Sequence, residues 1–317
     1  MISMNCIVVC GPTVSGKTKL AVQIAGSLNG EILSADSRQV YRGMDIGTGK
    51  DLHEYVKDGR SIPYHLIDIV DPSQIYTLYD YQRDFYKAFR DVTNRSHMPI
   101  VAGGTGLYIE AVLKGYHIAP VPEDVEFRKS LMAQPYEKLL QTLESENPQL
   151  LAKADISTKK RIVRALEISR SGFDVCRDEN EGKGDAPDFP QINPLILYLV
   201  WDRAILRERI ERRLHERFQN GMIDEVAKLL ESGISVDRLD LFGMEYRHIA
   251  GYLTKKVSYE QMTAELLQGI FHLAKRQDTW FRGMERRGMK VHHVQTADFE
   301  DVKKILSNNG MALILRD

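Results

Sequence analysis

The sequence has few cysteines, no long apolar run and almost no net charge, and each of these absences excludes a class of protein. Its three cysteines are unevenly spaced, so they form neither a disulfide framework nor a metal-ligand pattern. The longest apolar runs, such as residues 195–201, are far too short to cross a bilayer, and the amino terminus has no secretory signal. The formal charge of −1 excludes a general polycation. We therefore expect a globular protein of the reducing cytoplasm.

Basic residues nevertheless gather in two segments, each with few acids. The first contains Lys159, Lys160, Arg161, Arg164 and Arg170, and the second contains Lys275, Arg276, Arg282, Arg286, Arg287 and Lys290. A nucleic-acid partner would require local basic surfaces of this kind. Solvated faces of surface helices give the same pattern, and taken alone each segment slightly favours that interpretation.

The order of apolar runs predicts a P-loop NTPase-like α/β core that is interrupted by an inserted helical domain. Strand patterns occur at 6–10, 31–35, 65–70, 100–102 and 195–201, with an edge strand at 291–294, and helical patterns occur at 18–28, 79–95 and 105–114. This β-α-β alternation predicts a parallel sheet with helices on both faces.

The segment 116–193 differs from the rest of the chain. It is helical in pattern over 124–170, without a strand signal, and ends in a polar loop at 177–190. We therefore predict a core of residues 1–115 and 194–317, which includes C-terminal helices, and a helical insertion of residues 116–193.

A P-loop motif, G-x-x-x-x-G-K-[ST], occupies residues 11–18 between the first strand and the first helix. Its glycines allow several backbone N–H groups and the helix amino terminus to surround phosphate oxygens. Lys17 adds a positive charge, and the Thr18 hydroxyl is placed to ligate Mg²⁺. The motif indicates a diphosphate group without indicating a nucleoside, so a nucleotide kinase, an NTPase and a diphosphate-dependent transferase all remain open.

A predicted helix over 202–218 provides a second candidate for binding phosphate. It contains six arginines with acids interleaved, and Arg209 and Arg213 are four residues apart, so they share one face. A solvated, salt-bridged helix is an equally good interpretation of the spacing alone.

Six motifs, in order along the chain, resemble the tRNA dimethylallyltransferase family, whose members isopentenylate the adenosine next to the anticodon. The most distinctive is Asp36-Ser-Arg-Gln-Val-Tyr-Arg-Gly-Met-Asp-Ile-Gly-Thr48. The others are the P-loop and residues 65–72, 103–108, 161–167 and 274–280. The resemblance covers nearly the whole chain and fades in 172–193 and after about residue 290.

The resemblance implies a reaction and its participants. The donor is dimethylallyl diphosphate bound with Mg²⁺ and without ATP, and the acceptor is N6 of the adenosine 3′ of the anticodon in a tRNA anticodon stem-loop, whose base must leave its stack. The resemblance implies a diphosphate cradle made of Gly11, Thr13, Val14, Ser15, Gly16, Lys17, Thr18 and Arg213, with Thr18 as the metal ligand.

The same resemblance assigns the remaining site residues. Asp36 is implied as the general base, with Thr105 and Arg128 near the reaction channel. The implied tRNA-binding residues are Asp36, Ser37, Arg38, Gln39, Lys160, Arg161, Arg164, Lys275, Arg276, Gln277, Trp280 and Arg282. This interpretation replaces the solvated-helix interpretation of both basic segments.

The sequence departs from the family pattern at a few positions. Val14 stands where a smaller residue is usual, and Lys50-Asp51 replaces a common Lys-Pro. Glu245 stands where a glycine commonly precedes the tyrosine, which puts RNA contacts by residues 242–247 in doubt.

Three alternatives explain part of the sequence. A small-molecule or nucleotide kinase shares the P-loop but leaves the segment 36–48 unexplained. An adenylate prenyltransferase acting on free nucleotide leaves the insertion unexplained. A P-loop RNA-binding regulator without chemistry leaves intact Asp36 and Thr18 unexplained.

Overall fold

The computed structural model describes residues 4–173, 189–295 and 297–311. The chain divides into two compact units, one formed by Met1–Lys114 and Pro190–Asp317 and the other by Gly115–Phe189. Most of the predicted polar loop, residues 177–188, lies outside the described residues.

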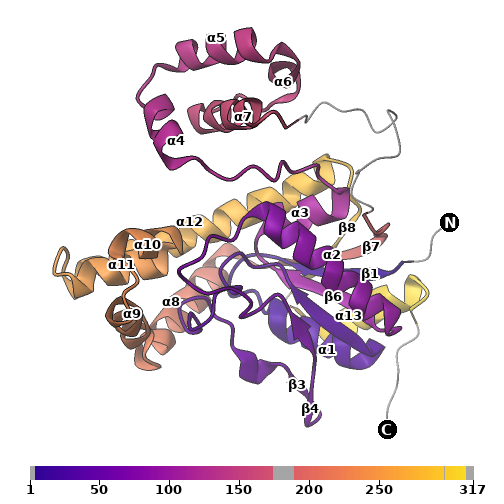
Figure 1. Ribbon diagram of the computed structural model, residues 1–317. Helices are drawn as coiled ribbons and strands as arrows, with labels where there is room; N and C mark the ends of the chain where they lie inside the picture. The colour runs from indigo at the N-terminus through magenta and orange to yellow at the C-terminus, as the bar shows by residue number, and fades with distance from the viewer. Residues whose placement is uncertain (1–3, 174–188, 296, 312–317) are drawn as a thin grey trace. The chain divides into compact units, whose positions relative to one another are not determined.

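A six-stranded parallel sheet forms the centre of the first unit (Figure 1), as the sequence predicted. Its strands, in spatial order, are β5 (Tyr64–His65), β2 (Gly30–Ser34), β6 (Met98–Gly103), β1 (Cys6–Cys10), β7 (Pro194–Val200) and β8 (Val291–Gln295). β1, β2 and most of β7 are buried, as their continuous apolar sequences require in a sheet covered on both faces. β8 is the edge strand predicted at 291–294.

The strand predicted over residues 65–70 is present only at its first residue, and the prediction is wrong for 66–70. Leu66 and Asp68 have φ angles of 65° and 56°, a left-handed conformation that interrupts the pleat, so β5 ends at His65. The remainder of the segment makes backbone hydrogen bonds to residues 39–42 and a single bridge between Tyr41 and Val70. A short antiparallel hairpin of β3 (Val56–Lys57) and β4 (Arg60–Ser61), preceded by the 3₁₀ turn η1 (Leu52–Glu54), was not predicted.

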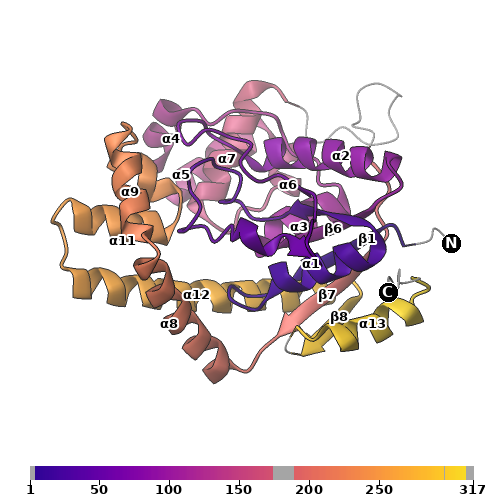
Figure 2. The ribbon, with the colours of Figure 1, turned by 90° about the horizontal axis from the view of Figure 1, so that it is seen from below.

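Helices cover both faces of the sheet (Figures 1 and 2). On one face, α1 (Lys17–Leu28) and α13 (Phe299–Asn308) pack their apolar residues against Ile7 and Val9 of β1 and against the leucines of β7 that share this face, Leu195, Leu197 and Leu199. On the other face, α2 (Leu78–Asn94) packs against β2, β6 and α3 (Gly106–Lys114). α2 begins with a capping box between Thr77 and Asp80.

A layer of helices adjoins the sheet within the first unit. It consists of α8 (Arg203–Gln219), α9 (Met222–Glu231), α10 (Val236–Leu241), α11 (Met244–Leu253) and the long α12 (Tyr259–Arg286). Their apolar faces share one core with Val40, Tyr41 and Met44 of the segment after β2. Among the described residues, none of the helices combines the length and apolar character that crossing a bilayer requires.

The second unit is helical. It contains α4 (Val125–Met132), α5 (Tyr136–Glu146), α6 (Pro148–Lys153) and α7 (Lys159–Ser171), which enclose a small apolar core of their own around Leu139, Leu143 and Ile162. The helices predicted over 124–170 are thus present, and no strand is assigned in the described residues of this unit.

Candidate active site at the carboxyl ends of three strands

Three segments with candidate functional residues leave the sheet at neighbouring carboxyl ends. The P-loop follows β1, Asp36 follows β2, and Thr105 follows β6, which lies between β1 and β2. Gly103 allows the close approach of these segments, since a Cβ there would collide with the Ala35 backbone. The Thr105 N–H donates to the Ala35 carbonyl at 3.1 Å. Parallel sheets bind ligands at this edge.

The P-loop has the features of an anion cradle. Gly16 precedes α1 with a φ of 89° and no side chain caps the helix, so its first N–H groups are open to an anion. The Ser15 hydroxyl is, among the described residues, a buried side-chain group without a hydrogen-bond partner. Lys17 donates to the Pro12 carbonyl at 2.7 Å. Burial lowers the pKa of Lys17 to about 8; the charge of Asp36 opposes this shift and that of Arg213 adds to it.

Trp201, which the sequence analysis did not assign, and Arg209 of the predicted arginine-rich helix both contact this loop. The Trp201 indole donates to the Ser15 carbonyl at 3.0 Å, and the Arg209 guanidinium donates to the Val14 carbonyl at 3.2 Å. Arg209 also lies over the Trp201 ring, 4.3 Å from its centre. Val14 itself has a φ of 63°, which is unfavourable for a β-branched side chain. These contacts help to hold a strained conformation of the loop.

Thr105 contacts the segment after β2 at Ser37, the residue next to Asp36. One carboxylate oxygen of Asp36 accepts the Arg38 N–H at 2.9 Å, as in an Asx turn, and the Thr105 hydroxyl oxygen accepts the Ser37 N–H at 3.1 Å. The Gln39 amide is bound at both ends, because it accepts from Ser34 and donates to the Gly49 carbonyl at 3.1 Å. Ser37 and Arg38 therefore remain the better candidates of this segment for contacts with RNA.

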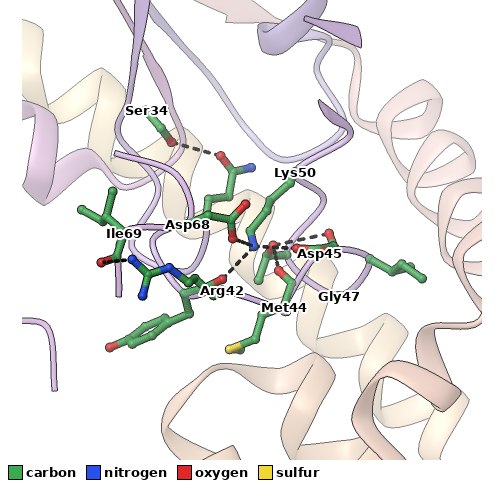
Figure 3. A network of polar contacts seen from close by, with 12 residues as sticks. Ser34, Arg42, Met44, Asp45, Gly47, Lys50, Asp68 and Ile69 are labelled. Atoms are coloured by element: carbon green, nitrogen blue, oxygen red, sulfur yellow. Dashed lines mark hydrogen bonds and ion pairs between the residues drawn. The ribbon is translucent and has the colours of Figure 1, made fainter. Parts of the chain in front are cut away.

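A buried lysine organises the rest of this segment (Figure 3). The Lys50 side chain is 1% exposed, and its ammonium group lies between the carboxylates of Asp45 and Asp68. It donates to Asp45 at 2.6 Å and to the Tyr41 carbonyl at 2.7 Å. Asp68 reaches this group because the chain turns away from strand geometry there.

Arg209 and Arg213 of α8 lie on one face of the helix, as their spacing predicted, and Arg217 continues this row; the three reach the P-loop and the segment 47–51. Arg213 forms an ion pair with Asp51, and Arg217 donates to the Gly47 carbonyl at 3.3 Å. Asp51 has a φ of 43°, which a proline cannot adopt. The predicted diphosphate arginine is thus paired with the residue that replaces the family's common proline.

Two residues of the segment 242–247 belong to the protein core. Phe242 and Tyr246 are buried, and the Tyr246 hydroxyl donates to Glu225 at 2.8 Å. Burial raises the pKa of Glu245, with the Asp36 charge acting in the same direction and Arg217 opposing it. Glu245 therefore lies within electrostatic range of the candidate base.

The basic residues predicted in the second unit divide into two groups. Arg164 donates to the Val121 carbonyl at 2.7 Å, and Arg128 makes ion pairs with Glu167 at 2.7 Å and with Glu123 at 2.5 Å. These two arginines hold the unit together. Lys160 and Arg161 are exposed on α7, where Arg161 pairs with Asp155.

The predicted residues of α12 also differ in their surroundings. Lys275 and Arg276 are exposed, and Arg282 is exposed but paired with Asp278 at 2.6 Å. Trp280 is 37% exposed and covers Gly106, whereas the Gln277 amide is bound to backbone groups of other segments. Lys275, Arg276 and Trp280 line an open groove of about 590 Å³ along the helix, and Arg282 is not part of its lining.

Family models match most of this chain. A model described as IPP transferase matches residues 39–284, and one described as isopentenyl transferase matches residues 4–68. The tRNA dimethylallyltransferase 1 of Syntrophus aciditrophicus is 47% identical over 96% of this chain and 98% of its own length. The tRNA dimethylallyltransferase 2 of Shewanella sediminis is 42% identical over 98% of this chain and 100% of its own length.

Solved structures with the same fold bear related names. The full-length tRNA isopentenylpyrophosphate transferase of Bacillus halodurans matches with a TM-score of 0.66 and 32% identity, covering 97% of this chain and 95% of that one. A eukaryotic dimethylallyltransferase acting on tRNA matches with a TM-score of 0.75 over 97% of this chain and 79% of that one. Its identity is 22%, so it supports the fold alone.

The ion pair between Arg213 and Asp51 generates a prediction about anion binding. Asp51→Asn removes an anion that competes with phosphate for the Arg213 guanidinium, so inorganic diphosphate should bind about two- to fivefold more tightly, as expected for a partly exposed pair. Isothermal titration of the purified variant measures this. Asp301→Asn, which removes a carboxylate on α13, is the control and should leave the affinity unchanged. Weaker binding by Asp51→Asn would instead make Asp51 the residue that orients Arg213.

Proposed function

The chain belongs to the IPP transferase family, and we propose that it transfers a dimethylallyl group from dimethylallyl diphosphate to N6 of the adenosine 3′ of the anticodon in tRNA. The observation that carries this proposal is the placement of Asp36 and the P-loop at the same edge of the sheet, at the carboxyl ends of two strands that flank β6. A donor bound by its diphosphate and an acceptor held near Asp36 would share one site.

The geometry suggests how each group contributes. Adenine N6 is a weak nucleophile, because its lone pair is delocalised into the ring. The new bond joins N6 to the allylic carbon while the carbon–oxygen bond to the diphosphate breaks. Lys17, Arg213 and the open N–H groups of α1 stabilise the negative charge that develops on the leaving diphosphate. Asp36 accepts the N6 proton through the carboxylate oxygen that is not used in the turn to Arg38.

A divalent cation would be held in this cradle by the Thr18 hydroxyl together with the donor. The described residues contain no group of three or more His, Cys, Asp or Glu that could hold a metal. The hydroxyl of Thr18, the second residue of α1, and the phosphate oxygens would hold Mg²⁺ when the donor is bound. The ion would supply additional neutralisation of the leaving charge.

The tRNA contacts belong to exposed residues of both units. Lys160 and Arg161 on α7, and Lys275 and Arg276 on α12, are placed to bind phosphates, and they position the RNA without reading its sequence. Thr105 and Ser37 lie next to Asp36, where the extruded adenine would enter. Arg128 forms ion pairs with Glu123 and Glu167 inside the second unit, and so would hold in place the helix that carries Lys160 and Arg161.

The activity itself is tested with labelled donor. Dimethylallyl diphosphate labelled in the dimethylallyl group should transfer its label to bulk tRNA in the presence of Mg²⁺, and AMP should remain unlabelled. Labelled AMP would identify an adenylate prenyltransferase. Hydrolysis of ATP stimulated by tRNA, without transfer of the label, would identify an NTPase.

The role of Asp36 is tested by Asp36→Asn, which keeps the shape of the side chain and removes the base. General base catalysis contributes about 100- to 10,000-fold, so the single-turnover rate at saturating tRNA should fall by that order. The affinity for tRNA should change much less, and it is measured separately on the same variant. Parental single-turnover rates would exclude the general-base role.

The basic residues of α12 are tested through the salt dependence of tRNA binding. Replacing Lys275 and Arg276 by glutamine removes about two phosphate contacts. The magnitude of the slope of log association constant against log salt concentration should therefore decrease by about two. Replacing Lys303 and Lys304 on α13 by glutamine removes the same charge elsewhere and is the control. An unchanged slope for the α12 variant would identify its basic face as merely solvated.

A further inference from the structure

The Gln277 side chain links α12 to two loops of the site. Its amide oxygen accepts the N–H of Thr13 at 2.7 Å, and its amide nitrogen donates to the Gly104 carbonyl at 3.0 Å. Both partners are backbone groups, 264 and 173 residues away in the sequence. The side chain therefore has one donor and one acceptor engaged by the loops.

Each of these loops supports one half of the proposed reaction. Thr13 stands at the start of the diphosphate loop, ahead of the strained Val14 and the buried Ser15 hydroxyl. Gly104 precedes Thr105, whose hydroxyl oxygen accepts the N–H of Ser37, next to Asp36. One amide thus holds the cradle of the donor and the turn beside the base.

A second contact joins α12 to the same turn. Trp280 lies so close over Gly106 that a Cβ on this glycine would collide with the indole ring. Gln277 and Trp280 are three residues apart, and therefore lie on one face of the helix. A movement of this part of α12 would be transmitted to the loops through both side chains.

Basic residues next to Gln277 on α12 are exposed to solvent. The open groove on the helix is lined by His272, Lys275, Arg276, Thr279, Trp280 and Arg286, among others. Lys275 and Arg276 are exposed and have no ion pair within the described part of the chain. Arg276 and Gln277 are adjacent, so the basic surface and the contact with the loops occupy a single turn of helix.

We propose that Gln277 is a positioning residue that couples tRNA bound on α12 to the binding of the donor in the diphosphate loop. The inference rests on the proposed function, and it replaces the expectation that the Gln277 side chain binds tRNA directly. RNA phosphates on Lys275 and Arg276 would fix this turn of α12, which lowers the cost of ordering the loop held by Gln277. The donor should then bind more tightly to the protein–tRNA complex than to the protein alone.

The coupling is measured by titrating dimethylallyl diphosphate into the full-length protein with and without a saturating anticodon stem-loop. The stem-loop carries purine in place of the target adenosine, so no N6 amino group is available and no turnover occurs. We expect the stem-loop to lower the Kd of the donor at least fivefold, which is within the usual range of coupling between two sites. In Gln277→Met, which keeps the length of the side chain and loses both hydrogen bonds, this factor should fall to about one.

Matched variants separate coupling from a general loss of structure. Gln268→Met changes an exposed glutamine of the same helix and should keep the parental factor. Gln277→Glu still accepts the Thr13 N–H but no longer donates to the Gly104 carbonyl. The stem-loop should therefore lower the donor Kd by a smaller factor in this variant than in the parent protein. Gln277→Glu replaces Gln277→Met in the test if the latter does not fold. The stem-loop should bind each folded variant within about threefold of the parental affinity.

Two results would overturn the inference. In the first, the stem-loop does not change the Kd of the donor in the parent protein. In the second, it lowers this Kd by the same factor in the parent protein, in Gln277→Met and in Gln277→Glu. If either occurs while the parent protein still prenylates tRNA, the inference fails and the proposed function stands. A parent protein that neither binds the stem-loop nor transfers the prenyl group would overturn both.

Discussion

The ammonium group of Lys50 is the interaction on which the candidate site most depends. The segment from Asp36 to Asp51 contains no helix or extended strand. Lys50 binds Asp45 and the Tyr41 carbonyl of this segment, and also Asp68, which lies 18 residues further along the chain (Figure 3). Burying a lysine is costly unless its charge is paired and hydrogen-bonded, and here both conditions are met. The arrangement fixes the segment that begins with the proposed general base.

Arginines of α8 contact the end of this segment and the P-loop. Arg209 supports the P-loop through the Val14 carbonyl, while Arg213 and Arg217 reach residues 47–51. Burial, together with repulsion from neighbouring arginines, lowers the pKa values of Arg209 and Arg217. An anionic donor would relieve this concentration of positive charge, which is a physical reason for a diphosphate to bind here.

The long helix α12 combines two roles that a sequence motif does not separate. Within residues 275–282, Lys275 and Arg276 face solvent, whereas Gln277 and Trp280 pack on the loops of the site. A similar division occurs in α7, where Arg164 binds backbone carbonyls of its own unit and Lys160 is exposed. Residues of one motif therefore serve binding and architecture together.

The parallel sheet, the P-loop and the family could all be predicted from the amino-acid sequence, because they depend on local apolar patterns and on short motifs whose residues are adjacent in the chain. The end of the strand at His65 could not be predicted in this way, since Asp68 turns toward a lysine 18 residues away in the chain. The same holds for the ion pair between Asp51 and Arg213, and for the contacts of Trp201 and Gln277 with the P-loop. These contacts join residues far apart in the chain, and no local pattern specifies their partners.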